Sequence, residues 1–165
     1  MKHILIFLLI LLTSCSHTYY IVRHAEKAEV PPGTANKDIP LSGRGLSRAL
    51  ALRDLLKHKN IHYVFSTDYN RTRATVQPVA DYFHLPVELY GPAPDEAFIS
   101  KLKAIRKNVV IAGHSNTVDD IVDMICGKKR VGGDLDESEF DNLFIVKKRG
   151  KRYIFKKEHY GPSPH

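Results

Sequence analysis

The chain has 165 residues, of which 43% are hydrophobic and 26% are charged. This balance is typical of one folded domain and excludes a largely disordered chain. The formal charge of +7 is compatible with nucleic acid, an anionic membrane face or a phosphorylated substrate as partner, or with a basic surface that only faces solvent.

The first residues predict a secretory signal peptide. A positive start precedes the unbroken apolar run Ile4 to Leu12, which is too short to span a bilayer as a helix of ~20 residues. The run ends in Leu12-Thr13-Ser14-Cys15, which resembles the lipobox of bacterial lipoproteins, in which the cysteine is lipidated and becomes the new N-terminus. We therefore expect removal of residues 1–14 and an exported domain, residues 15–165, anchored by lipid at Cys15 on the periplasmic or cell-surface side. The alternative is an ordinary signal peptide with an incidental cysteine.

The rest of the chain alternates strand-like and helix-like segments. In chain order we expect strand 18–23, helix 42–58, strand 61–66, helix 69–83, strand 86–89, helix 95–105, strand 108–112, helix 116–126 and a hairpin of 143–148 with 152–156. The residues between 28 and 40 and between 127 and 139 are expected to form loops. This alternation predicts an α/β layered fold with a mostly parallel sheet.

Two of the helices carry start signals and one carries a clear apolar stripe. Ser42 is placed to cap the first helix, and Asn116 with Asp119 has the spacing of a capping box variant at the last. The apolar stripe of the first helix is expected to consist of Leu46, Ala49, Leu50, Leu52, Leu55 and Leu56. Arg44 and Arg48 on the same helix are expected on the solvated surface.

Arg and His side chains follow three of the predicted strands. Arg23-His24 ends the first strand, Arg71 and Arg73 follow the second, and Gly113-His114 ends a later one. Active sites of open α/β sheets lie past the carboxyl ends of the strands, so these side chains are expected to converge. Arg binds phosphate oxygens bidentately, and a neutral imidazole can attack phosphorus. The set predicts a phosphate site that needs no metal or cofactor.

Four motifs in this order resemble the histidine phosphatase superfamily, which includes the phosphoglycerate mutases. The motifs are Arg23-His24-Ala25, Leu41-Ser42-Gly43-Arg44-Gly45, the set Ser66, Arg71 and Thr75, and Gly113-His114. They extend over nearly the whole mature chain, and their order is more specific than a lone Arg-His pair. The resemblance implies a three-layer α/β/α sandwich of the phosphoglycerate mutase type.

The resemblance also implies roles for individual residues. His24 is expected to be the phosphorylated nucleophile, with Arg23 and Arg71 binding the phosphoryl oxygens and His114 donating to the same group. Ser115 and Asn116 are expected to contact phosphate or substrate.

The proton donor is open at this point. Many family members place an acid after the second Arg, and Glu96 or Asp95 is the nearest candidate by order. Both residues are equally compatible with the first turn of a helix, where acids stabilise the helix dipole. Loss of the acid would point to substrates with a good leaving group, such as phosphohistidine.

The predicted function is hydrolysis of a phosphomonoester or phosphohistidine on a small molecule, glycan, lipid or protein. A non-catalytic lipoprotein that binds a phosphorylated ligand, a lipopolysaccharide-modifying phosphatase and a mutase-type phosphotransferase are the alternatives. No metal-ligand spacing is found, and nucleic acid is not expected because no stacking pattern accompanies the basic residues. The acidic run 134–139 is interpreted as a solvated loop near the site, and the basic residues between 147 and 157 favour anionic lipid headgroups.

Overall fold

Strands and helices alternate along the chain as the sequence pattern predicts. The computed structural model describes residues 16–30 and 38–163, so the predicted signal peptide and Cys15 lie outside the described residues. The elements are β1 (Ser16–Arg23), α1 (Gly43–Leu56), β2 (Ile61–Thr67), α2 (Asn70–Phe83), β3 (Val87–Tyr90), α3 (Glu96–Ala104), β4 (Asn108–Gly113), α4 (Val118–Cys126), β5 (Asn142–Arg149) and β6 (Arg152–His159). Within these residues, no helix has the length and apolar character that crossing a membrane requires.

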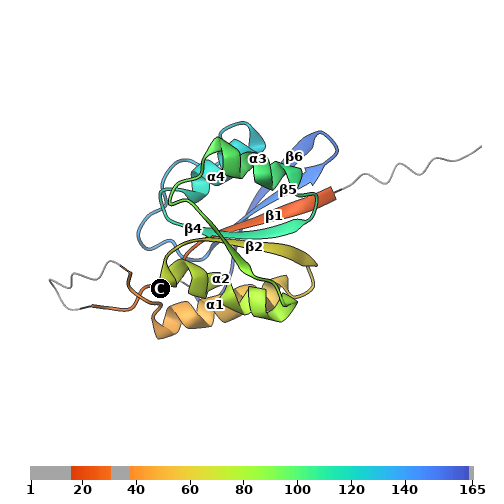
Figure 1. Ribbon diagram of the computed structural model, residues 1–165. Helices are drawn as coiled ribbons and strands as arrows, with labels where there is room; N and C mark the ends of the chain where they lie inside the picture. The colour runs from red at the N-terminus through yellow and green to blue at the C-terminus, as the bar shows by residue number, and fades with distance from the viewer. Residues whose placement is uncertain (1–15, 31–37, 164–165) are drawn as a thin grey trace, which may run out of the picture.

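The strands form one six-stranded sheet in the order β3-β2-β4-β1-β5-β6. Strands β1 to β4 are parallel to one another, β5 pairs with β1 in the antiparallel direction, and β6 pairs with β5 in the same way. Helices α1 and α2 cover one face and α3 and α4 the other, which confirms the three-layer α/β/α sandwich (Figure 1). We call the edge where β1 to β4 end the carboxyl edge. The opposite edge, which holds the turns after the four helices and the β5–β6 turn, is the amino edge.

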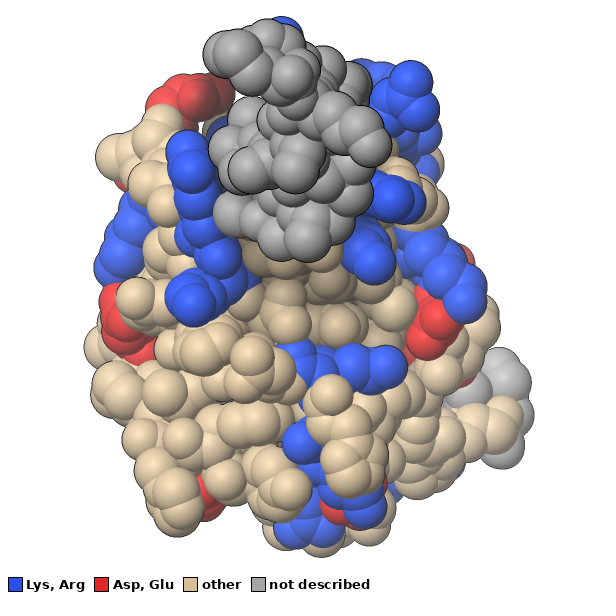
Figure 2. Space-filling view, turned by 90° about the vertical axis from the view of Figure 1, so that its right-hand side faces the viewer, with Lys and Arg blue, Asp and Glu red and all other residues tan. Residues whose placement is uncertain are grey.

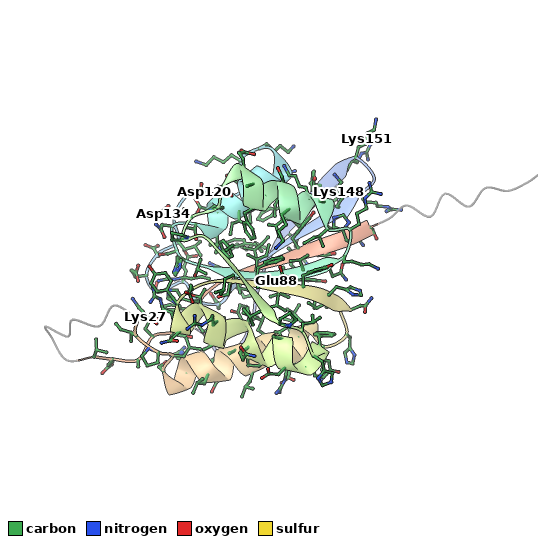
Figure 3. All side chains as sticks on the ribbon, in the orientation of Figure 1. Lys27, Glu88, Asp120, Asp134, Lys148 and Lys151 are labelled. Carbon is green, nitrogen blue, oxygen red and sulfur yellow. The ribbon has the colours of Figure 1, made fainter. Side chains whose placement is uncertain are left out.

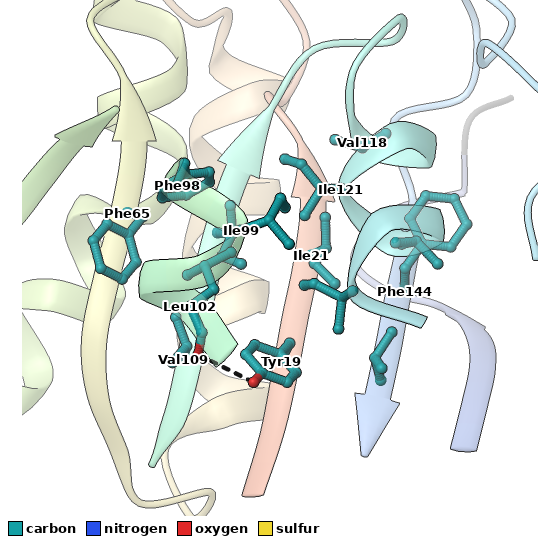
Figure 4. Close-up of a cluster of buried hydrophobic side chains, with 14 of the residues drawn as sticks. Tyr19, Ile21, Phe65, Phe98, Ile99, Leu102, Val109, Val118, Ile121 and Phe144 are labelled. Atoms are coloured by element: carbon teal, nitrogen blue, oxygen red, sulfur yellow. Dashed lines mark hydrogen bonds between the residues drawn. The ribbon is translucent and has the colours of Figure 1, made fainter. Parts of the chain in front are cut away.

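Strand β1 is buried on both faces because its side chains alternate between two hydrophobic clusters. Tyr19 and Ile21 face the cluster under α3 and α4, where the Tyr19 hydroxyl donates to the carbonyl of Leu102 at 3.1 Å (Figure 4). Tyr20 and Val22 face the cluster under α1 and α2. Both clusters and all ten elements lie after residue 15, so we expect the chain that begins at Ser16 to fold by itself.

Two details of the helices differ from the prediction. In α1, Ser42 caps the helix as predicted, but Leu46 and Leu50 are 53% and 45% exposed. The buried stripe of α1 follows positions 45, 48, 49, 52 and 56, and the two leucines are rotated away from it.

The second difference is at the start of α4. The helix begins at Val118, not Asn116, and Thr117 occupies the N-cap position. Asn116 is left in a turn closed by hydrogen bonds from Thr117 and Val118 to the carbonyl of His114, and so the predicted capping box does not form.

Candidate active site

A cavity of about 360 Å³ opens at the carboxyl edge of the sheet. Arg23 and His24 reach it from the end of β1, Arg71 from the first turn of α2, and His114 from the residue after β4. The remaining lining residues are Lys27, Tyr69, Pro92, Ser115, Asn116 and Glu137. The structure therefore brings together six of the seven residues predicted for catalysis and substrate binding, and Glu96 is the exception.

His24 is held as a neutral imidazole with one nitrogen occupied. Its backbone N–H donates to Gly113 at 2.9 Å, and its Nδ1 lies 2.8 Å from the carbonyl of Ala25. A carbonyl can only accept, so Nδ1 carries the proton and the lone pair is on Nε2. Burial lowers the pKa of His24 to about 3, and the positive charges of Arg23 and Arg71 act in the same direction. The ring is thus unprotonated at neutral pH, as a nucleophile must be.

His114 is oriented by threonine hydroxyls. Its Nε2 lies 2.9 Å from Oγ1 of Thr67, and the rings of His24 and His114 meet edge to face with 5.6 Å between centroids. Oγ1 of Thr67 donates to Oγ1 of Thr72 at 3.1 Å, so it accepts from Nε2–H of His114, and the lone pair of the neutral ring is on Nδ1. Burial lowers the pKa of His114 to about 4, with Arg71 and Arg23 contributing. Gly113, the residue before His114, lets the end of β4 lie close to Tyr90, because a Cβ there would lie 2.9 Å from the Tyr90 hydroxyl.

Arg23 is 1% exposed and is fixed by the loop that leads to β5. Its Nη1 donates to the carbonyl of Asp136 at 2.7 Å, its Nη2 donates to the carboxylate of Glu137 at 2.9 Å, and its guanidinium stacks on Phe140 at 4.2 Å. Its Nε is buried and has no hydrogen-bond partner among the described residues. The position of one positive charge is therefore set before any ligand binds.

Arg71, and not Arg73, is the second arginine of the cavity. Its guanidinium stacks on the Tyr69 ring at 4.5 Å, and its Nη1 lies 4.0 Å from the carboxylate of Asp38. Arg73 points elsewhere and pairs with Asp68. The two guanidinium groups of Arg23 and Arg71, with Lys27 at the rim, make the cavity suited to a multiply charged oxyanion.

The predicted acids do not reach the cavity. Asp95 is the N-cap of α3 and accepts from the backbone N–H of Phe98 at 2.7 Å, and Glu96 lies in the first turn of that helix. Both positions fit helix stabilisation. The carboxylate that does line the cavity is Glu137, whose side chain is 78% exposed and which forms an ion pair with Arg23. Glu137 belongs to the run interpreted from the sequence as a solvated loop. Its pairing with Arg23 could not be predicted from the sequence, because the two residues are 114 positions apart.

A second buried arginine supports the strand end from behind. Arg48 is completely buried, which corrects the prediction that it lies on the solvated surface. Its guanidinium donates to both carboxylate oxygens of Glu26, at 2.9 and 2.6 Å, and to the carbonyl of Tyr160 at 2.7 Å. Gly45 lets α1 approach this segment, since a Cβ there would lie 2.3 Å from the carbonyl oxygen of Glu26. The Leu-Ser-Gly-Arg-Gly motif thus braces the residues that follow His24.

No group of three or more His, Cys, Asp or Glu residues that could hold a metal ion occurs in the part of the chain that the structure describes. The donors gathered in the cavity are mainly cationic or neutral, which is the chemistry of an anion site.

Comparison with known proteins agrees with the motifs. Residues 19–91 match the model of the histidine phosphatase superfamily (branch 1). These residues contain three of the four motifs, and the match supports the predicted superfamily and a phosphatase enzyme. No curated protein matches the chain.

Several solved structures share the fold at low sequence identity. The chain is similar to the protein histidine phosphatase SixA complexed with tungstate, with a TM-score of 0.65, 18% identity, and coverage of 86% of this chain and 96% of that one. The putative phosphohistidine phosphatase SixA from Agrobacterium tumefaciens gives a TM-score of 0.61 at 18% identity, covering 88% and 98%. A phosphoglycerate mutase from Bacillus anthracis gives 0.57 at 16%, covering 88% and 93%.

Proposed function

We propose that the chain, whose residues 19–91 match the model of the histidine phosphatase superfamily, is a metal-independent phosphatase that forms a phospho-His24 intermediate. The observation that carries the proposal is the state of His24. Its Nδ1 proton is held by Ala25, its pKa lies at about 3, and it shares a cavity with two arginines and a second histidine. A neutral Nε2 beside an oxyanion site is the arrangement that phosphoryl transfer to histidine requires.

In the first step, Arg23 and Arg71 bind the equatorial oxygens of the phosphoryl group. Nε2 of His24 forms a bond to phosphorus while the bond from phosphorus to the leaving group breaks, and the leaving group takes the electron pair. The two guanidinium groups stabilise the charge spread over these oxygens, and His114 lines the same cavity beside them.

In the second step, water attacks the phosphorus of phospho-His24. The P–N bond breaks and its electron pair returns to Nε2. Inorganic phosphate leaves with the oxygen and the protons of the attacking water. Water can reach the site, since the cavity opens at the carboxyl edge, and His24 is restored as the neutral ring held by Ala25.

Neither Asp95 nor Glu137 is placed to donate a proton to a leaving group, which favours substrates with a good leaving group. Phosphohistidine is the substrate that we propose. Asp95 is used as a helix cap, and the ion pair of Glu137 with Arg23 uses the deprotonated carboxylate, which has no proton to give. An alkoxide needs a general acid to leave, whereas a phosphorylated imidazole leaves readily. One solved structure with this fold is described as a protein histidine phosphatase and two as putative phosphohistidine phosphatases, which supports the same substrate class.

We further propose that the enzyme is exported and anchored by lipid at Cys15. The support is the sequence Leu12-Thr13-Ser14-Cys15 after an apolar run. Ser16, the first residue after the cysteine, already belongs to β1, so the domain begins without a linker.

The test compares the chain from Ser16 onward with its His24→Ala variant. Each is incubated with a phosphohistidine peptide and with an aryl phosphate in the presence of a metal chelator, and phosphate release is followed. The proposal predicts turnover in the chelator that His24→Ala abolishes, and faster turnover of the phosphohistidine peptide. Binding of phosphate without turnover of either substrate would identify a non-catalytic binding protein instead.

A further inference from the structure

The turns at the amino edge carry one sign of charge. The turns after α1, α2 and α3, residues 127–131 directly after α4, and residues 149–152 around the β5–β6 turn contain no Asp or Glu. They contain ten Lys and Arg residues, namely Lys57, Lys59, Arg106, Lys107, Lys128, Lys129, Arg130, Arg149, Lys151 and Arg152. We call this set the basal surface. Figure 2 looks onto this end of the molecule, where blue side chains gather and few red ones appear.

The structure brings these turns together in space. Asn108 links two of them, because its side chain donates to the carbonyl of Lys59 at 2.5 Å and accepts from the backbone N–H of Thr18 at 2.9 Å. The α4 turn meets the β5–β6 turn around a hollow of about 390 Å³. That hollow is lined by Cys126, Lys128, Arg130, Lys151, Arg152, Tyr153 and Ile154. In Figure 3, Lys148 and Lys151 lie at this end, and Lys27 and Asp134 lie at the opposite end.

The basal cations are available to a partner. Nine of the ten are exposed and Arg130 is half-buried, and within residues 16–30 and 38–163 none of them forms an ion pair with a carboxylate. Burial first, and then the charges of Lys148 and Arg106, lower the pKa of His17 near the start of β1. The positive charges at this edge therefore also act on His17, a buried group of the protein.

Helix dipoles explain only part of this charge. Cations near helix C-termini are favourable, and four helices end here. The β5–β6 turn has no helix, yet Arg149, Lys151 and Arg152 surround its one glycine. The exposed Ile154 beside them, with Tyr153, adds an apolar and aromatic contribution typical of surfaces that contact headgroups and the outer acyl region.

We infer that the basal surface docks on an anionic lipid bilayer, with lipid phosphates in the hollow between the α4 turn and the β5–β6 turn. Each Lys or Arg near an anionic membrane adds to the attraction, and ten on one surface form a polybasic patch. The lipobox cysteine is the residue before Ser16, which pairs with Arg149 on this same edge. A lipid anchor at Cys15 and the basal surface would thus act at the same face.

Docking in this orientation has a consequence for the substrate, which rests on the proposed function. β1 runs from the basal surface to the cavity over eight residues, and its seven steps of ~3.3 Å separate the two ends by about 23 Å. Phosphates of the supporting membrane are then out of reach of His24. The substrate is a soluble molecule or a protein domain, and not a lipid of that membrane.

The experiment uses the chain from Ser16 onward, which lacks any lipid, in flotation with vesicles of phosphatidylcholine alone or with one third anionic phospholipid. The basal variant is Lys128→Gln, Lys151→Gln and Arg152→Gln. The matched control lowers the net charge by the same amount at other positions, with Arg44→Gln, Arg73→Gln and Lys157→Gln. Thermal unfolding and turnover of a soluble substrate check that each variant is folded.

We expect binding to anionic vesicles only, weakened by 0.5 M salt through screening. The basal variant should bind at least about tenfold more weakly, the control within about twofold of wild type, and turnover of the basal variant should be unchanged. Equal losses in both variants would mean that net charge and not this surface is responsible. No binding to anionic vesicles, or equal binding to neutral ones, would also overturn the inference, and neither result would affect the proposed phosphatase.

Discussion

The two edges of the same sheet use positive charge in opposite ways. At the carboxyl edge, Arg23 and Arg48 are 1% and 0% exposed and each is paired with a carboxylate. At the amino edge, nine of the ten basal cations are exposed, and none of the ten has an ion pair with a carboxylate among the described residues. The turns of the carboxyl edge, in the residues described, carry ten acids, namely Glu26, Glu29, Asp38, Asp68, Asp95, Asp134, Asp136, Glu137, Glu139 and Asp141.

This difference shows that a net charge of +7 says little about function until the charges are placed. The arginines of the carboxyl edge are held in one geometry for a small oxyanion, at the expense of desolvation. The basal cations remain solvated and suit a broad, fluid partner. The comparison leads to predictions that we order from the largest expected effect to the smallest.

The largest contrast is expected in turnover. His24→Ala removes the nucleophile, and we expect phosphate release to fall on the order of 10³-fold or more. Lys151→Gln at the amino edge should change it by less than about twofold, because a solvated charge at that distance is screened. Steady-state kinetics on one aryl phosphate measures both rates. A comparable loss in the two variants would contradict the claim that turnover depends on the carboxyl edge and not on the amino edge.

Stability should divide in the same way. Arg48→Met leaves the half-buried Glu26 with Arg44 as its one remaining ion-pair partner and removes the donor to the carbonyl of Tyr160, and we expect the free energy of unfolding to fall by about 3 kcal/mol. Lys129→Met at the amino edge should change it by about 0.5 kcal/mol or less, as for an ordinary surface position. Urea denaturation of both variants gives the comparison, and a small effect for Arg48→Met would show that the ion pair is dispensable.

The buried carboxyl edge also determines the response to pH. A pKa of about 3 for His24 means that the ring stays neutral and nucleophilic until the pH falls to about that value. After correction for ionisation of the substrate, kcat/KM should be level between pH 7 and about 4, and then fall about tenfold per pH unit below about 3. Circular dichroism at each pH checks that the protein is folded. A decline centred near pH 6.5 would mean that His24 titrates like a solvated histidine.

The smallest effect is expected for Glu137. Its exposed carboxylate competes with phosphate for Nη2 of Arg23, so Glu137→Gln should lower KM by up to about fivefold with kcat little changed. Glu158→Gln, which breaks the surface pair with Lys156, is the matched control and should leave KM as it was. A large fall in kcat for Glu137→Gln would instead identify Glu137 as the proton donor.

Most of the fold could be predicted because short stretches of sequence indicate each helix and strand. The parallel strands, their helices and the Ser42 cap follow from periodicity and capping chemistry within short windows. The side of α1 that packs could not be predicted as well, since Leu46 and Leu50 are as apolar as the leucines that are buried. Only the position of the neighbouring α2 and the sheet decides between them.

The site also has a part that could be predicted from local sequence and a part that could not. His24, Arg23, Arg71 and His114 could be predicted to converge because each follows a strand end at one edge. The pairing of Arg48 with Glu26 and of Arg23 with Glu137 joins residues 22 and 114 positions apart, without a local signal in either case. Asp95 and Glu96 were candidates for the acid by order alone, and helix capping accounts for Asp95.

The central claim is that phosphoryl groups pass through His24, and trapping the intermediate tests it most directly. The chain from Ser16 onward is mixed briefly with a phosphohistidine peptide carrying radioactive phosphate, quenched with alkali, digested and mapped by mass spectrometry. The account predicts an acid-labile phosphate on the peptide that contains His24, and no label in His24→Ala. Turnover without label on His24, or label retained in His24→Ala, would contradict it.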